Sequence, residues 1–340
     1  MPKIKLIQCG VGHHGKSWSE VTPRHDDFDL VAIVDIVPAA LEAAGAFANL
    51  PRDRWFSSLD EAVEKVDADA VLTVTPPLVH VEHAKLAFSR GMHLITEKPI
   101  ADSLANAKLM VDLAERANRQ LMVTQNYRYM PAPRRLRSLL AEKPVGELGH
   151  GHIDFYIAGD FTGSFRQTMD YPLLVDMAIH HLDLLRAVTG KNIRRVTAHT
   201  FNPSWSWYQH HAGLKMFLEL DGNIHFSYSG DWSAKGKQTP WGGAWRLQCE
   251  RGSIHYEGEN VSIGHGEFWG KDQRMDAVEV PQFETSGQSL MLSDFAKAIR
   301  TGHPAECAGR DNLQSFAAIM AGVKSAKEGR AVEVAEFLAG

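Results

Sequence analysis

The 340-residue chain contains only three cysteines, Cys9, Cys249 and Cys307, and they lie far apart. Such spacing fits neither a disulfide framework nor a zinc site, so we expect reduced and mostly buried thiols, and no metal site. No apolar run approaches the length of a membrane span. No apolar signal segment precedes the first strand-like run either, so we expect a cytoplasmic protein.

A strong excess of one charge is also lacking, because the formal net charge is only -5. This balance gives no reason to expect a nucleic-acid partner or an anionic membrane surface. Hydrophobic residues make up 44% and charged residues 23%, as in an ordinary globular protein. Internal repeats and low-complexity tracts are absent. The length therefore favours two globular domains.

A glycine-rich turn stands near the start of the chain. Residues 3–9 read as a strand, and the run GVGHHG at 10–15 follows as a GxGxxG pattern that opens a helix. Gly10 permits a tight turn, Gly12 lets a pyrophosphate approach the backbone, and Gly15 lets helix and strand pack closely. The pattern alone is weak evidence, because glycine-rich turns are common.

An acidic residue strengthens this interpretation. Residues 30–34 read as a second strand, and Asp35 ends it about 20 residues beyond the third glycine, where a carboxylate can accept both ribose hydroxyls. The alternative is an acidic residue that merely caps a strand end. A carboxylate here would repel a 2′-phosphate, and Ile36-Val37-Pro38 supplies no cation, so we expect NAD rather than NADP.

Strands and helices continue to alternate up to residue 125. The expected strands are 70–74, 93–96 and 121–124, and the expected helices are 42–48, 80–90 and 103–118. This order predicts an α/β fold whose first domain, residues 1–125, is a Rossmann domain with a doubly wound parallel sheet. The triplet Glu97-Lys98-Pro99 follows one of these strands. Lys98 is therefore expected at the carboxyl edge of the sheet, where ligands bind.

The pattern changes after Asn126. Five strand-like runs follow with few helices between them, at 151–158, 195–200, 214–220, 224–229 and 245–250. Asp221-Gly222 has the composition of a hairpin turn. We expect a second domain, residues 126–340, of α+β class with a large, mainly antiparallel sheet. The outer face of this sheet needs cover, and the run Lys215–Leu218 looks apolar on both faces, so we expect a homo-oligomer.

One helix, residues 173–190, is predicted inside this domain. Asp176, His180 and Asp183 are spaced i, i+4 and i+7 and should share one helical face. A solvated face is the alternative, but the flanking residues are almost all apolar, as in a buried helix. His180 is the better general acid/base, because its ordinary pKa of about 6.5 lies near working pH. Asp176 could orient it, and His181 should pack in the core.

Together, the glycine turn, Asp35, the Glu97-Lys98-Pro99 triplet and Asp176-x-x-x-His180 resemble the Gfo/Idh/MocA family. The family takes its name from glucose–fructose oxidoreductase, inositol dehydrogenase and a rhizopine-catabolism protein. The resemblance covers nearly the whole chain and includes Thr75-Pro76-x-x-x-His80. It implies an NAD(P)-dependent dehydrogenase that acts on a sugar, polyol or related cyclic alcohol. It also implies a homodimer or homotetramer.

The resemblance further implies roles for single residues. Lys98, Asp176 and His180 match the catalytic positions, and Tyr127 and Arg128 match a segment that borders the substrate. The expected cofactor-binding residues are Gly10, Gly12, His13, Gly15, Asp35, Thr75, Pro76, His80, Glu97, Lys98 and Asn126. The chain departs from the family at Ala178, where glycine is common, and at Tyr171-Pro172, which replaces a glycine pair before the helix.

Two other functions stay open. Some relatives keep NAD tightly bound and act as redox-neutral glycosidases or lyases, and others are binding proteins that have lost the lysine or the Asp/His pair. An aromatic set gathers in one stretch of the second domain: Trp205, Trp207, Tyr208, Trp232, Trp241 and Trp245. Such side chains suit the faces of a cyclic sugar or polyol, although they could equally fill an oligomer interface.

Overall fold

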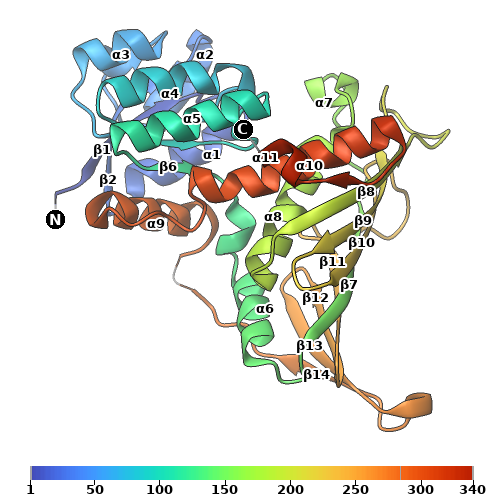
Figure 1. The fold of residues 1–340 in the computed structure, drawn as a ribbon. Coiled ribbons are helices and arrows are strands. Elements are labelled where there is room, and N and C mark those ends of the chain that lie inside the picture. The colour runs from blue at the N-terminus through green and yellow to red at the C-terminus, as the bar shows by residue number, and fades with distance from the viewer. Residues whose placement is uncertain (1, 284, 339–340) are drawn as a thin grey trace. The chain divides into compact units, whose positions relative to one another are not determined.

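The computed structural model describes residues 2–283 and 285–338 (Figure 1). The described chain forms two compact units. The first unit contains residues 2–126 and 285–313, and the second contains residues 127–283 and 314–338. The later segment 285–313 thus belongs to the first unit. The division after residue 125 that we expected from the sequence stays a prediction.

The first unit is built on a six-stranded parallel sheet in the order β3-β2-β1-β4-β5-β6. This is the doubly wound order that the alternation of strands and helices predicted, so that part of the fold is confirmed. The strands are β1 Ile4–Cys9, β2 Phe28–Val34, β3 Trp55–Phe56, β4 Ala70–Thr73, β5 His93–Thr96 and β6 Leu121–Val123.

Helices follow most of these strands (Figure 1). They are α1 His14–Val21, α2 Pro38–Ala48, α3 Leu59–Lys65, α4 His80–Ser89, α5 Leu104–Ala117 and, from the later segment, α9 Gly287–Thr301, with 3₁₀ turns at Thr22–Arg24, Arg52–Arg54, Pro77–Val79 and Asn126–Tyr129. Right-handed crossovers put α1 and α2 on one face of the sheet and α4 and α5 on the other. In agreement, α1 packs against α2 and α9, and α4 packs against α5.

The start of α5 shows how local sequence sets an element boundary. The Ser103 hydroxyl accepts a hydrogen bond from the Asn106 backbone N–H at 3.3 Å, as expected of an N-cap serine. The helix then buries Ala107, Met110 and Val111. It ends at Asn118, whose φ of 51° is the left-handed conformation common at helix C-termini.

The second unit is built on a nine-stranded sheet in the order β14-β13-β12-β11-β7-β10-β9-β8-β15. All neighbouring strands are antiparallel except β7 and β10, so the mainly antiparallel sheet is confirmed. The strands are β7 Leu148–Tyr156, β8 Ile193–Phe201, β9 Gly213–Leu220, β10 Ile224–Asp231, β11 Ala244–Cys249, β12 Gly252–Glu257, β13 Asn260–His265, β14 Arg274–Val278 and β15 Val332–Glu333.

The remaining helices are α6 Pro131–Glu142, α7 Phe165–Thr168, α8 Ala178–Thr189, α10 Gly309–Glu328 and α11 Ala335–Leu338, with a 3₁₀ turn at Phe268–Gly270. Helices α6 and α8 pack against each other over one face of the large sheet (Figure 1). Helix α10 begins in the first unit and ends in the second.

The outer face of the large sheet is less apolar than the sequence suggested. Strand β9 buries Leu214, Met216 and Leu218 and turns Lys215 and Phe217 outward. Phe217 is 47% exposed and stacks on the His225 ring, with centroids 5.6 Å apart. The run Lys215–Leu218 therefore exposes one large apolar side chain rather than two apolar faces.

The helix predicted over residues 173–190 is not a uniform α-helix. Leu173–Met177 forms a π-helical turn, and α8 begins only at Ala178. The expected i, i+4, i+7 stripe therefore starts in a different kind of helix, because Asp176 lies in the π turn. The stripe is nevertheless buried: Asp176 is 8%, His180 9% and Asp183 1% exposed. The solvated-face alternative is excluded.

The structure also describes the state of the cysteines and the character of the helices. All three cysteines are buried thiols, as predicted. Among the helices of the described residues, none is both long enough and apolar enough to cross a membrane.

His181 is a core residue, as predicted. Its Nε2 lies 2.9 Å from the Trp241 carbonyl oxygen, which only accepts, so Nε2 carries the proton and donates. Nδ1 then accepts from the Tyr228 hydroxyl at 3.0 Å. Burial lowers the pKa of His181 to about 4, and the hydrogen bond to the Trp241 carbonyl oxygen opposes this shift. The neutral imidazole is thus the form that the core accommodates.

Lowering the pH from 7 to 5 should therefore destabilise the protein. The folded pKa lies below the ordinary value of about 6.5, so the unfolded chain binds the proton first. The stabilisation from His181 is complete above pH 6.5 and is lost as the pH falls toward 4. Urea unfolding at each pH should show a smaller pH slope for His181→Gln, by at most about 1.4 kcal/mol per pH unit.

Tyr228→Phe is the matched control for this prediction. It removes one hydrogen bond but keeps the titrating imidazole, so stability should fall while the pH slope persists. An unchanged slope in His181→Gln would contradict the prediction.

Candidate active site

The glycine turn after β1 has the geometry expected of a dinucleotide-binding loop. Gly10 has a φ of +82°, and a Cβ there would lie 2.5 Å from the Val74 carbonyl oxygen. A Cβ on Gly15 would lie 2.2 Å from the Gly10 carbonyl oxygen. The packing of the chain itself thus requires both glycines. A Cβ on Gly12 would meet nothing closer than Ala40 at 3.7 Å, which leaves the role of this glycine in ligand approach a prediction.

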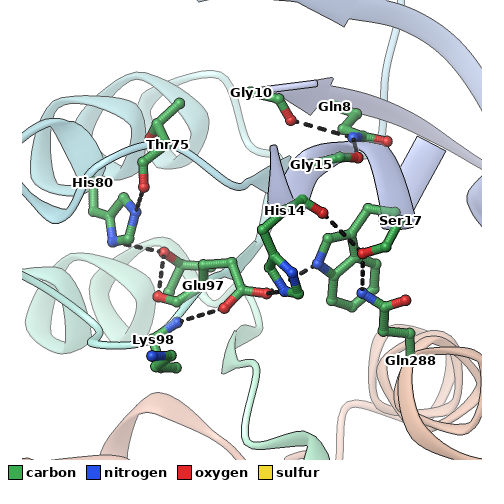
Figure 2. Close-up of polar contacts among 12 residues, drawn as sticks. Gln8, Gly10, His14, Gly15, Ser17, Thr75, His80, Glu97, Lys98 and Gln288 are labelled. Atoms are coloured by element: carbon green, nitrogen blue, oxygen red, sulfur yellow. Dashed lines mark hydrogen bonds and ion pairs between the residues drawn. The ribbon is translucent and has the colours of Figure 1, made fainter. Parts of the chain in front are cut away.

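A buried glutamine holds this turn in place. The Gln8 side-chain amide donates to the Gly15 carbonyl oxygen at 2.8 Å and lies 3.3 Å from the Gly10 carbonyl oxygen (Figure 2). The same nitrogen lies 3.0 Å from the Ser19 hydroxyl. One side chain thereby connects β1, the turn and the first turns of α1.

Asp35 lies at the end of β2, beside the glycine turn. Its Oδ2 accepts hydrogen bonds from the backbone N–H groups of Val11 at 2.9 Å and Gly12 at 3.2 Å. Its Oδ1 accepts from the Val37 N–H at 2.9 Å. Three backbone donors therefore fix the carboxylate next to the turn. This agrees with the expected ribose-binding position without testing it.

Glu97 is a buried carboxylate at the end of β5 (Figure 2). Its Oε1 accepts from the Trp18 indole N–H at 2.9 Å and lies 3.1 Å from His14 Nε2, and its Oε2 accepts from the Lys98 backbone N–H at 3.1 Å. Burial would raise the pKa of Glu97, but contacts with His14 and Trp18 outweigh it and lower the pKa to about 2. Glu97 is thus ionised and held rigidly beside Lys98.

His80, the first residue of α4, supports the segment around Lys98-Pro99. Its Nε2 donates to the Thr75 carbonyl oxygen at 2.8 Å, and its Nδ1 lies 3.0 Å from the Thr96 hydroxyl and 3.1 Å from the Ile100 carbonyl oxygen. Burial lowers the pKa of His80, so the ring is neutral and Nδ1 can accept from Thr96. The ring thus connects Thr75, after β4, with Thr96 and Ile100, which flank Lys98-Pro99 in the chain. The Lys98–Pro99 peptide bond is cis.

The other expected cofactor residues follow strand ends at the same edge of the sheet. Thr75 comes after β4, Lys98 after β5 and Asn126 after β6, and all three side chains are half-buried, whereas Pro76 is exposed. His13 has an unusual φ of 40° as the residue that precedes α1. The first unit thus brings its expected cofactor residues to the carboxyl edge of one parallel sheet, the usual ligand side of this architecture.

In the second unit, the expected catalytic residues lie on the π turn and on α8. The Tyr127 ring stacks on the His180 ring, with centroids 4.8 Å apart and planes 24° apart. Asp176 accepts a hydrogen bond from Arg166 Nε at 2.6 Å. Tyr127, expected next to the substrate, therefore packs on the expected general base, and Asp176 has a cationic partner that the sequence did not reveal.

Arg128, also expected at the substrate, is buried and makes a two-pronged ion pair with Asp183. Its Nε and Nη2 each lie 2.6 Å from a carboxylate oxygen of Asp183. The Ser315 hydroxyl donates to the same carboxylate at 2.7 Å. This arrangement supports the connection between residues 126–130 and α8. A direct role of Arg128 toward substrate stays a prediction.

The aromatic set divides into buried and exposed members. Tyr208 and Trp232 stack with ring centroids 6.0 Å apart, and both are buried, as is Trp245. Trp205 and Trp241 are about half exposed. Part of the set is therefore core, and a sugar-binding role for any member stays a prediction.

Sequence reasoning missed three residues: His14 and Trp18, which contact Glu97, and Arg166, which contacts Asp176. His14 and Trp18 are one helical turn apart, so they share a face of α1, but their partner lies about 80 residues away. Among the described residues, no group of three or more potential metal ligands lies together.

Two family models match this chain. The model described as "Oxidoreductase family, NAD-binding Rossmann fold" matches residues 4–125, and the one described as "GFO/IDH/MocA C-terminal domain" matches residues 134–255. Together they span more than half of the chain.

Similar proteins support the same relationship. D-apiose dehydrogenase of Paraburkholderia graminis is 26% identical over 351 residues, which cover 98% of this chain and 89% of that protein. An oxidoreductase from Agrobacterium radiobacter, in complex with NAD⁺, L-tartaric acid and magnesium, has a TM-score of 0.88 at 20% identity and covers 98% of this chain and 99% of that one.

A protein from Desulfitobacterium hafniense named as a NADPH-dependent oxidoreductase also has a TM-score of 0.88, at 17% identity, with 99% of each chain covered. At such identities these structures show the fold alone. The two model matches show the family: this chain is a member of the Gfo/Idh/MocA oxidoreductases, with an NAD-binding Rossmann domain.

Proposed function

We propose that this protein is an NAD-dependent dehydrogenase that transfers hydride between the nicotinamide and a cyclic sugar, polyol or related alcohol. The observation that carries the proposal is the buried His180, stacked on Tyr127 and one turn from Asp176, in a chain that also keeps Lys98. The relative named D-apiose dehydrogenase supports a net oxidation of a sugar. No observation favours the redox-neutral alternative.

The residues at the carboxyl edge of the parallel sheet fit a dinucleotide. The bare backbone at Gly12 and the N-terminus of α1 suit a pyrophosphate, and Asp35 suits the ribose hydroxyls. Pro76, Glu97 and Asn126 would line the nicotinamide side. When bound, NAD supplies the hydride acceptor.

The chain's own groups handle the proton and the developing charge. His180 removes the hydroxyl proton, because a neutral imidazole accepts a proton at working pH. The Lys98 ammonium stabilises the negative charge that grows on the substrate oxygen. Asp176 keeps His180 oriented, and the Tyr127 ring restricts its tilt. Tight packing around the imidazole keeps competing water away from the reacting proton.

His180→Ala and Lys98→Met should each lower kcat by at least about 10²-fold, because each removes a group that acts on the reacting hydroxyl. Steady-state rates of NAD reduction over a panel of monosaccharides, inositols and sugar acids would measure this. In His180→Ala, cofactor affinity, read from NADH fluorescence, should change little.

His303→Ala, at an exposed histidine in the connection after α9, is the control, and its rates should match those of the parent. Near-normal turnover in either active-site variant would contradict the catalytic role proposed for that residue. Activity only on acyclic hydroxy acids or amino acids would end the cyclic-sugar proposal.

We also propose NAD over NADP. Asp35 would repel a 2′-phosphate, and Arg52, a cation further along the chain, is already paired with Glu42 at 3.3 Å and stacked on Trp55 at 5.0 Å. Asp35→Asn removes the charge and keeps one of the two acceptor oxygens. It should therefore shift the NAD/NADP ratio of kcat/KM toward NADP by roughly tenfold, equivalent to about 1.4 kcal/mol.

Glu64→Gln removes a charge at an exposed position of α3 in the same unit and should leave that ratio unchanged. Equal use of both cofactors by the parent protein would refute the preference.

We further propose a homodimer or homotetramer in which a second copy covers the outer face of the large sheet. Light scattering at micromolar concentration should show more than one chain per particle. Phe217→Glu, which adds a charge to that face, should shift the mass downward. Phe47→Glu on α2, where Phe47 is similarly exposed, is the control and should not shift it. A monomeric parent protein would contradict this proposal.

A further inference from the structure

Arg166 has the features of a substrate-binding residue. It lies on α7, in the connection from β7 to the π turn, and its Nε donates to Asp176 at 2.6 Å. The guanidinium carbon lies 5.1 Å from the ring centroid of Phe161 and 4.7 Å from that of Phe165. The side chain is 30% exposed. Within the described residues, its terminal nitrogens Nη1 and Nη2 make no hydrogen bond.

The segment that carries Arg166 is held firmly by its neighbour Gln167. The Gln167 side chain accepts from the Gly163 N–H at 2.9 Å and donates to the Trp207 carbonyl oxygen at 3.1 Å. The Gln167 backbone carbonyl oxygen accepts from the Gln209 N–H at 3.0 Å. Arg166 is therefore presented on a braced segment and loses little freedom when it binds a ligand.

Three members of the aromatic set, Trp207, Tyr208 and Trp232, help to hold this segment in place. The Trp207 indole N–H and the Tyr208 hydroxyl both donate to the Gly159 carbonyl oxygen, at 3.0 and 2.6 Å. Trp232, which stacks on Tyr208, also contacts the Phe161 ring edge-on at 5.0 Å. Phe161 in turn lies beneath the Arg166 guanidinium. These aromatic residues therefore pack beneath the Arg166 guanidinium and support it.

A guanidinium has five N–H donors, arranged along edges that each match the two oxygens of an oxyanion. Asp176 takes the Nε donor and fixes the plane of the group. The edge formed by Nη1 and Nη2 is left for a second oxyanion, in bidentate geometry. A neutral sugar would bind this edge more weakly, because its hydroxyl oxygens carry no negative charge to strengthen the hydrogen bonds.

We propose that Arg166 is a specificity-determining residue that binds an anionic group, a carboxylate or a phosphate, on the sugar or polyol substrate. The proposal rests on the proposed function and narrows its substrate class to sugar acids or sugar phosphates. Arg166 recognises the substrate without taking part in hydride or proton transfer. Its loss therefore raises KM for the anionic substrate and leaves kcat close to that of the parent.

The test uses the full chain with saturating NAD and matched ligands: D-glucose, D-glucuronate and D-glucose 6-phosphate, with the three corresponding galactose compounds. Calorimetric binding and NAD reduction are measured for each. The parent should bind the uronate or the phosphate at least roughly tenfold more tightly than the neutral sugar. Preference between the two anions identifies the source of the charge.

Arg166→Gln should lose roughly 10- to 100-fold in KM for the preferred anion and change little for the neutral sugar, because one charge-assisted interaction is removed. Arg166→Lys, which keeps the charge but not the fork, should recover part of the loss. Arg251→Gln, at an exposed arginine of the same unit, is the charge control and should behave as the parent. Unchanged thermal melting in Arg166→Gln excludes a folding defect.

Two results would overturn the inference. The first is the absence of anion preference in the parent, whether neutral sugars bind as well or no compound binds. The second is an equal fall in kcat for neutral and anionic substrates in Arg166→Gln, which would make Arg166 a positioning residue for Asp176. If only the proposed function fails, the result is different: the parent binds the anion in a way that depends on Arg166, but no compound supports NAD reduction.

Discussion

A carboxylate taken out of water must be met by hydrogen-bond donors, and this constraint arranges the candidate residues of both units. Glu97 is met by Trp18 and the Lys98 backbone, Asp183 by Arg128, and Asp176 by Arg166. Trp18 is 79 residues from Glu97, and Arg128 is 55 residues from Asp183. Glu97 and Asp183 therefore join distant parts of their units. Removing the partner of either one would leave a buried charge unmatched.

Buried histidines complement these carboxylates by staying neutral. His80 and His181 each donate one ring N–H to a backbone carbonyl oxygen, and each has a hydroxyl group beside the other nitrogen. A neutral imidazole satisfies both partners at once, because one ring nitrogen donates to the carbonyl oxygen and the other accepts from the hydroxyl. Burial lowers the pKa of both rings. These rings thus brace the Lys98 turn and the core beneath α8 without adding charge.

The features that could be predicted from the sequence are those set by short-range pattern. The glycine turn, the doubly wound parallel sheet and the burial of Asp176 and His180 follow from the order of the elements, from residue spacing and from flanking apolar residues. The π turn could not be predicted, because residues 173–177 lie in an apolar run that has no period to distinguish one helix type from another. Strand β14 is exposed along most of its length and so lacks the alternation that identifies a strand.

Residue contacts across long sequence separations were equally beyond prediction. The contact of His14 with Glu97 could not be predicted, because the two residues are 83 positions apart and only the fold brings them together. Arg166 stands only ten residues before Asp176, but in a connection with no regular pattern. The site residues found from sequence were those inside a family motif, whereas their partners lie outside it.

The discontinuous first unit also affects how the protein is made. The Val123 N–H at the last strand of the parallel sheet donates to the Cys307 carbonyl oxygen at 2.9 Å, and Met122 forms a bridge with Ala308. Helix α9, from the same later segment, buries Met291 and Phe295. At ordinary translation speeds these partners leave the ribosome roughly 10 to 40 seconds after β6. During that interval the nascent nucleotide-binding unit exposes an unfinished sheet edge and an uncovered apolar surface, while the whole of the second unit's large sheet except β15 is being synthesised.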